Sequence, residues 1–142
     1  MRHVLIAAGL AALVTIAAAA QEDASKPEFY TAKVLPILKQ HCYQCHSAAM
    51  HSGGLNMEER DGFLKDAMLG PAVAPGDPAN SLLMTLIKQD GPPGYAPPMP
   101  PPPNAKLSDA EIATIEQWIK AGLVMPAPAA APAAAPAAPA HP

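Results

Sequence analysis

The apolar residues of this 142-residue chain recur at helical spacing, and the first such stretch covers residues 27–42. Phe29, Val34 and Leu38 fall on one stripe there, as residues do on the buried face of an amphipathic helix. Pro36 interrupts the stretch, and a proline inside a helix removes a hydrogen-bond donor and crowds the preceding turn. We therefore expect a helix that kinks or restarts near Pro36.

The clearest helix signals occur in residues 107–122. Ser108 and Glu111 have the spacing of a capping box, in which each side chain accepts a hydrogen bond from the backbone N–H of the other residue. Gly122 is suited to end the helix in a left-handed conformation. The apolar stripe comprises Ile112, Ile115 and Ile119. Trp118 lies beside that stripe, so we expect it in the core, packed against the first helix or against a cofactor.

Two shorter helices are expected between these segments. Asn56 and Glu59 stand in a capping-box relation before a short helical piece. Asp77 is a suitable N-cap, with Pro78 at the first helical position, before another apolar face. That face comprises Leu82, Leu83, Leu86 and Ile87. No segment alternates apolar and polar residues between hairpin turns, so the pattern predicts an all-α fold of four or so helices.

The first 20 residues have the features of an export signal. Arg2 precedes an uncharged apolar run over residues 4–20, and the small residues Ala18 and Ala20 fit a cleavage site. The alternative is a retained membrane anchor, for which the run is short and rich in alanine. We expect residues 1–20 to be a signal peptide. The mature chain would then reach a compartment outside the cytoplasm, most simply a bacterial periplasm, and would not be an integral membrane protein.

The other end of the chain is a proline and alanine tract, residues 126–142, without any carboxylate, lysine or arginine. Its prolines block a continuous helix and its alanines offer too little apolar surface for a core. We expect a disordered, extended tail that links or tethers the protein. Residues 21–125 remain as one small domain of 105 residues, which a large apolar cofactor would help to stabilise.

The charge of the chain bears on whether nucleic acid is a partner. Without Arg2 the chain carries eight Lys and Arg residues against twelve Asp and Glu residues, a formal charge of −4. The basic residues are scattered singly, and no basic patch with interleaved aromatic residues is present in the sequence. We therefore expect no nucleic-acid partner.

The two cysteines of the chain, Cys42 and Cys45, lie in the sequence "HCYQCH", with His46 directly after the second. A thioredoxin-like redox pair belongs at the start of a helix in a βαβ unit, and no strands are predicted here. A structural zinc site needs four ligands, and no second pair at a recognised spacing is present. Cys-x-x-Cys-His is the attachment signature of haem c. We therefore predict one covalently bound haem, attached outside the cytoplasm.

A candidate for the second axial ligand lies in the segment "GPPGYAPPMPPPPNAK", which has eight prolines between residues 92 and 103. The prolines restrict this loop without regular secondary structure, and Met99 is the one thioether within it. A long irregular loop between two helices of a small domain is usually functional. We expect Met99 to be presented toward the interior.

These segments resemble class I c-type cytochromes, and most closely the planctomycete-type cytochrome c domain family, over about residues 29–123. The segments that carry the resemblance are "VLPILKQHCYQCH", "SGGLNMEERDGFLK", "PGDPANSLLMTLI" and "MPPPPNAKLSDAEIATIEQWIKAG". The resemblance implies a small cytochrome c fold in which a few helices surround one haem and the first and last helices cross. It also implies that thioethers from Cys42 and Cys45 hold the haem, with His46 as the proximal ligand and Met99 as the distal ligand.

One departure from the pattern concerns the ligand imidazole. Many class I proteins have a proline soon after the motif, and its carbonyl accepts a hydrogen bond from the ligand histidine. The corresponding sequence here, "SAAMHSGG", has no proline. The group that orients His46 is therefore open at this point.

Other candidate ligands carry weaker signals. Met68 lies in a glycine-bounded stretch and is the next methionine to consider. The methionines expected to fill the core are Met50, Met57, Met84 and Met125. His51 follows His46 too closely to reach the opposite haem face with ease, and His41 is expected at the surface near the haem edge. Three tyrosines are expected to be partly buried with wet hydroxyls, or to reach a haem propionate: Tyr30, Tyr43 and Tyr95.

The function expected from these residues is transfer of single electrons between redox-partner proteins by an exported monohaem cytochrome. A haem with both axial positions filled offers no position for a substrate, so we do not expect an enzyme. The alternative is a haem-based sensor or small catalytic module, in which Met99 is displaced from the iron. No catalytic acid–base pair is apparent in the proline loop, which favours the carrier.

Overall fold

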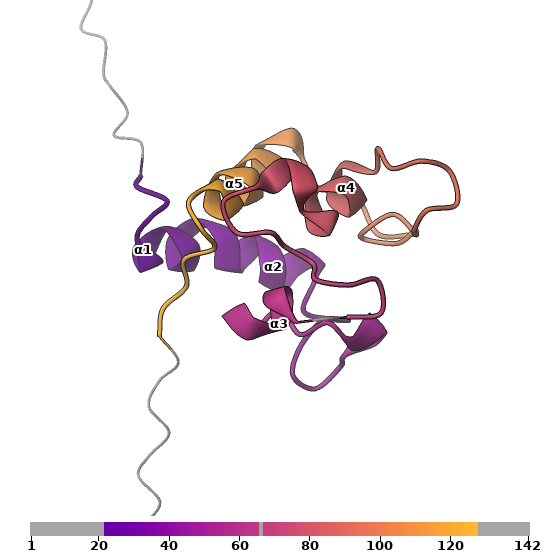
Figure 1. The fold of residues 1–142 in the computed structure, drawn as a ribbon, viewed down its shortest axis with the longest axis horizontal. Coiled ribbons are helices and arrows are strands. Elements are labelled where there is room, and N and C mark those ends of the chain that lie inside the picture. The colour runs from indigo at the N-terminus through magenta and orange to yellow at the C-terminus, as the bar shows by residue number, and fades with distance from the viewer. Residues whose placement is uncertain (1–21, 66, 128–142) are drawn as a thin grey trace, which may run out of the picture.

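The computed structural model describes residues 22–65 and 67–127, and these residues fold into short helices joined by long loops (Figure 1). Within the described ranges the regular elements are all helical, and two isolated bridges, His46–His51 and Ala67–Gly70, supply the only extended pairing. The all-α prediction is confirmed for this part of the chain. The expected signal peptide and residues 128–142 of the expected tail lie outside the described residues.

The first helical segment changes its hydrogen-bonding pattern just before Pro36, which confirms the expected restart. It consists of α1 (Pro27–Phe29), a π-helical turn (Tyr30–Val34) and α2 (Leu35–His41). The backbone N–H of Leu35 reaches back five residues to the carbonyl of Tyr30. Since Pro36 has no N–H of its own, the wider turn lies where the regular α-helical ladder would lose a donor.

Helix α3 (Arg60–Leu64) begins with Glu59 as its N-cap residue, and the predicted capping box between Asn56 and Glu59 is wrong. Glu59 is extended and makes no side-chain cap bond. The Asn56 side chain instead accepts a hydrogen bond from the backbone of Glu58 at 3.0 Å. Asparagine often bonds its own neighbouring backbone in this way, and that local turn competes with the cap.

A tight contact under α3 gives a stability prediction. A methyl group added at Gly62 would overlap the backbone carbonyl oxygen of Asn56. We expect Gly62→Ala to lower the free energy of unfolding by about 1–3 kcal/mol, because the backbone must move to admit the methyl group. Urea denaturation measures this loss. Asp61→Ala, at the exposed neighbouring position, should cost no more than about 0.5 kcal/mol. An equal loss for the two variants would contradict the packing argument.

Asp77 caps a turn as predicted, but the helix expected to continue from it is interrupted. Its carboxylate accepts from the backbone N–H of Asn80 at 3.2 Å, at the start of a 3₁₀ turn (Pro78–Asn80). Ser81 is then extended and α4 (Leu82–Lys88) begins after it. The buried Ser81 hydroxyl donates to the Asp77 carbonyl at 2.8 Å and accepts from the Ala74 N–H at 3.0 Å. These bonds hold the break between the two turns.

The last helix, α5 (Asp109–Lys120), has both predicted end signals. Ser108 and Glu111 form the full capping box. At the other end Gly122 has a φ of 100°, which favours glycine, and its N–H bonds the carbonyl of Ile119 at 2.9 Å. The N–H of Leu123 bonds the carbonyl of Trp118 at 3.1 Å, which completes a Schellman motif.

Trp118 is fully buried and joins three helical segments, as the sequence predicts for a core residue. Its ring lies 5.4 Å from the ring of Tyr30 and 5.4 Å, edge to face, from the ring of Phe63. Its indole N–H donates to the Val124 carbonyl at 2.8 Å. The last helix therefore packs on both the first helical segment and α3.

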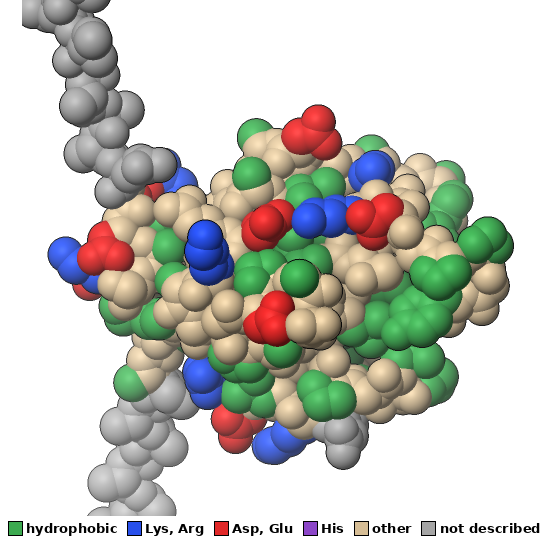
Figure 2. Space-filling view, turned by 45° about the horizontal axis from the view of Figure 1, so that its top comes forward, with side chains coloured by type: hydrophobic (Ala, Val, Ile, Leu, Met, Phe, Trp, Pro, Cys, Tyr) green, Lys and Arg blue, Asp and Glu red, His purple; other side chains and the backbone are tan. Residues whose placement is uncertain are grey.

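Apolar side chains also reach the surface of the described part of the chain. In Figure 2 they gather on the right, over the end of the molecule where Figure 1 places the long loop after α4. Among the described residues, the exposed large apolar side chains are Met50, Met68, Leu69 and Tyr95. None of the helices in the described part of the chain has both the length and the apolar character needed to cross a membrane.

Candidate haem-binding site

The motif of two cysteines and a histidine forms a turn that continues directly from the end of α2. Cys42 is the C-cap residue of α2, and its N–H bonds the Leu38 carbonyl at 2.8 Å. The Cys42 carbonyl accepts from the N–H of Cys45 at 3.1 Å and from that of His46 at 2.9 Å. The helix end thus brings both thiols and the imidazole into one turn, as the contiguous spacing predicts.

The two thiols are free, and their surroundings do not suit dithiol redox chemistry. Cys42 is buried and Cys45 is exposed. Burial, and secondarily the neighbouring Cys45, raises the pKa of the Cys42 thiol to about 12. The thiol also lies at the C-terminal end of a helix, where the helix dipole disfavours a thiolate. Reactive cysteines need a lowered pKa, so this turn argues against the thioredoxin-like alternative.

The zinc alternative lacks a ligand set in the described ranges. Among residues 22–65 and 67–127, no three His, Cys, Asp or Glu side chains come together in an arrangement that could hold a metal ion. A structural zinc site needs four such ligands around the metal. Two thiols and one imidazole in a single turn instead match what covalent attachment of a haem requires.

His46 is half-buried, and burial lowers the pKa of its imidazole. The backbone groups of Ser52 and Leu55 act in the opposite direction. The neutral imidazole, which burial favours, is the form that binds iron. Its Nδ1 atom is buried and has no hydrogen-bond partner. A buried polar atom without a partner is uncommon in native structures, and it marks this ring as one with a further role.

Met99 lies on the proline loop and packs partly buried against the core. Its N–H bonds the Leu86 carbonyl of α4 at 3.1 Å, and the Gln89 side chain reaches the Met99 carbonyl at 3.5 Å. Met68 is 82% exposed. Met99 follows α4, whereas the turn of residues 42–46 follows α2, so the two lie in separate parts of the chain. No hydrogen bond among the described residues joins them.

The donor groups on these elements fit a haem c. Two free thiols, a neutral imidazole and a thioether form the set that such a group uses, and all four come from Cys42, Cys45, His46 and Met99. The remaining methionines divide between core and surface. Met57 and Met84 are buried in the core as expected, whereas Met50 is exposed.

The other candidate side chains lie in different surroundings. His51 is exposed and forms an isolated backbone bridge with His46, which places the two backbones side by side. Tyr95 is exposed. Tyr30 is buried, unlike the expected residue with a wet hydroxyl, and its hydroxyl lies 3.1 Å from that of Tyr43. The sequence gives no signal for this hydroxyl pair, which joins the motif turn to a residue thirteen positions earlier.

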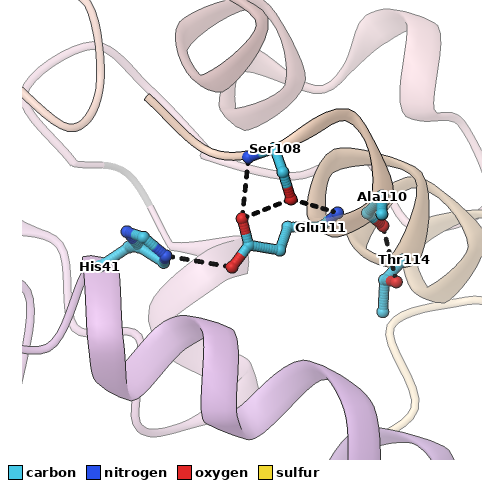
Figure 3. Close-up of polar contacts among 5 residues, drawn as sticks. All are labelled: His41, Ser108, Ala110, Glu111 and Thr114. Carbon is cyan, nitrogen blue, oxygen red and sulfur yellow. Dashed lines mark hydrogen bonds and ion pairs between the residues drawn. The ribbon is translucent and has the colours of Figure 1, made fainter. Parts of the chain in front are cut away.

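The expectation that His41 lies at the surface is wrong. Only 13% of its side chain is exposed, and its Nε2 atom lies 3.1 Å from Oε1 of Glu111 (Figure 3). The other carboxylate oxygen of Glu111 accepts from the backbone N–H and the hydroxyl of Ser108 at 2.8 and 2.7 Å. The cap of α5 is therefore also a contact with the end of α2, directly before Cys42.

This contact makes stability depend on pH. The hydrogen bonds from Ser108, and secondarily His41, hold the pKa of Glu111 below its ordinary value of 4.5. Since the folded pKa is the lower one, the stabilising contribution is present above pH 4.5 and is lost as the pH falls through the folded pKa. We expect Glu111→Gln to cost about 1 kcal/mol at neutral pH and to flatten the acid limb of the stability curve.

Urea midpoints measured across the acid range test this expectation. Gln117→Ala, on the exposed side of the same helix, removes no titrating group and is the control. If the acid limb of Glu111→Gln matches that of the wild-type protein, the contact does not carry the pH dependence.

Comparison with known families gives one match. Residues 42–103 match the family model described as Planctomycete cytochrome C, which confirms the resemblance seen in the sequence. The matched range contains Cys42, Cys45, His46 and Met99, and it leaves out helices α2 and α5. The comparison with curated proteins and the comparison with solved structures each gave no match.

Proposed function

We propose that this chain, whose residues 42–103 belong to the planctomycete cytochrome C family, is an exported monohaem c-type cytochrome that carries single electrons between redox-partner proteins. The observation that carries the proposal is the turn at the end of α2. It brings the two thiols of Cys42 and Cys45 together with the half-buried imidazole of His46. A family of haem-binding domains and a site with the matching donor set point to the same group.

The residues have distinct roles in this proposal. Cys42 and Cys45 would hold the haem through thioethers, formed when each S–H adds across one vinyl group. His46 would supply the proximal ligand and Met99 the distal one. The bound haem would supply an iron that gains or loses one electron.

The arrangement of the proline loop supports a carrier rather than a sensor or catalyst. Met99 is fixed to α4 through its own backbone, by the bond to the Leu86 carbonyl. An anchored loop would hold the Met99 thioether in place as a ligand, and both axial positions would then be filled, which would leave none for a substrate. Between residues 91 and 107 the ionisable side chains are Tyr95 and Lys106, which do not form an acid–base pair.

Export belongs to the same proposal and rests on the sequence of residues 1–20. Haem c is attached outside the cytoplasm, so a cleaved signal peptide and a periplasmic location suit the motif. The proline and alanine tract of residues 126–142 would link the haem domain to a partner or a surface.

A redox titration combined with carbon monoxide exposure tests the function. The protein produced with its signal peptide and haem-maturation machinery should titrate as one reversible one-electron couple, and its reduced form should not bind carbon monoxide readily. Full and rapid binding of carbon monoxide by the reduced wild-type protein would favour the sensor or catalytic module, because the distal position would then be open.

A further inference from the structure

The unpartnered Nδ1 atom of His46 raises the question of what orients the imidazole. A histidine that binds a metal almost always donates its other ring N–H to a carbonyl, a carboxylate or water, and that bond sets the orientation and basicity of the ring. No proline follows the motif to supply a carbonyl, and Nδ1 is buried away from solvent. The acceptor must therefore come from the backbone that surrounds the ring.

The backbone beside the ring is the loop of residues 46–57. The two ends of this loop are joined by the bond from the Met57 N–H to the His46 carbonyl, at 2.9 Å. The middle of the loop is tied back to the motif by the bond from the Ser52 N–H to the Cys45 carbonyl, at 3.0 Å. Nδ1 itself makes no hydrogen bond to this loop in the structure. The carbonyls of the loop are the candidates to accept one from the imidazole.

Tyr43 holds this loop from inside the motif. Its hydroxyl donates to the Met57 carbonyl at 3.3 Å. Because that donation uses the one hydroxyl proton of Tyr43, Tyr30 is the donor in the 3.1 Å contact between the two hydroxyls. The Tyr30 ring in turn lies against the buried ring of Trp118. Both backbone polar groups of Met57 are therefore hydrogen-bonded: its N–H donates to the His46 carbonyl, and its carbonyl accepts from the Tyr43 hydroxyl.

We propose that Tyr43 is a positioning residue for the haem ligand His46: its hydroxyl fixes Met57, and so fixes the loop whose carbonyls would accept the Nδ1 proton of His46 when the imidazole binds iron. The inference rests on the proposed function, since it concerns the imidazole as a ligand of haem iron. A hydrogen bond at Nδ1 makes the ring a stronger electron donor and stabilises oxidised iron. Loosening the loop weakens that bond and favours the reduced state.

Tyr43→Phe in the haem-loaded protein tests the inference, because it removes the hydroxyl and keeps the ring. We expect the redox equilibrium to move about threefold toward the reduced form, which is about 30 mV at 59 mV per tenfold change. We also expect two spectra of the oxidised protein to change, because both report the orientation of the axial imidazole. These are the electron paramagnetic resonance spectrum and the chemical shifts of the haem methyl protons in the NMR spectrum.

Tyr30→Phe is the matched control. It removes the hydroxyl bonded to Tyr43 but keeps the bond from Tyr43 to Met57. We expect both variants to melt at a lower temperature and only Tyr43→Phe to change the potential and the spectra. Equal spectra and potentials for the wild-type protein and Tyr43→Phe, or equal changes in both variants, would overturn the inference. Failure of the proposed function would appear separately, as a wild-type protein without a bound haem.

Discussion

Replacing Met99 by alanine is expected to remove the sixth ligand of the haem, with three measurable results. The weak near-infrared band that class I cytochromes show for iron–methionine ligation should disappear from the oxidised protein. The reduction potential should fall by on the order of 100 mV or more, because a soft thioether stabilises reduced iron. The reduced protein should then bind carbon monoxide. Optical spectroscopy and a redox titration measure all three.

Met68→Ala is the control for that experiment, since Met68 is the alternative thioether and is almost fully exposed. It should leave the band, the potential and the resistance to carbon monoxide unchanged. The loop after α4 should keep its bond from the Met99 backbone to Leu86 in the Met99 variant, because alanine has the same N–H. A near-infrared band that survives in Met99→Ala and is lost in Met68→Ala would assign the ligand to Met68.

The second large effect is expected for Cys42→Ala combined with Cys45→Ala. Without both thiols no thioether can form, so any haem held by His46 alone should be extracted from the denatured protein by acid and acetone. The wild-type protein should keep all of its haem under the same treatment. The haem absorbance of the two precipitated proteins, compared after extraction, measures the difference.

The single variants make that test sharper. Cys42→Ala and Cys45→Ala should each retain a haem through one thioether, with one vinyl group left unreacted and a shifted absorption maximum. Cys42 is the buried thiol, so its replacement also removes a side chain from the core. Retention of the haem by the denatured double variant would contradict attachment through thioethers, because that variant has no thiol.

The parts of the fold that the sequence predicts are those controlled by neighbouring residues. The ends of α5 follow from Ser108, Glu111 and Gly122, because the hydrogen bonds that cap the two ends join residues no more than five positions apart. The restart at Pro36 follows from the missing N–H of that one residue. The break at Ser81 was not predictable in this way, because it depends on the fit of the Ser81 hydroxyl between Asp77 and Ala74.

In the candidate site, too, the arrangement of neighbouring residues is predictable and the contacts between distant segments are not. Cys42, Cys45 and His46 are contiguous, so a single turn after α2 brings them together whatever the rest of the chain does. The contacts around them join distant segments, as between Tyr43 and Tyr30 or between His41 and Glu111, seventy residues apart. Hydrophobic periodicity carries no information on such pairs, which is why His41 was expected at the surface.

The central claim is that this chain holds one haem covalently through the turn at the end of α2. The mass of the denatured protein, produced with its signal peptide and haem-maturation machinery, tests that claim most directly. We predict the mass of the polypeptide plus one haem, with the haem on the peptide that contains Cys42 and Cys45. The mass of the polypeptide alone, with a disulfide between Cys42 and Cys45, would contradict it.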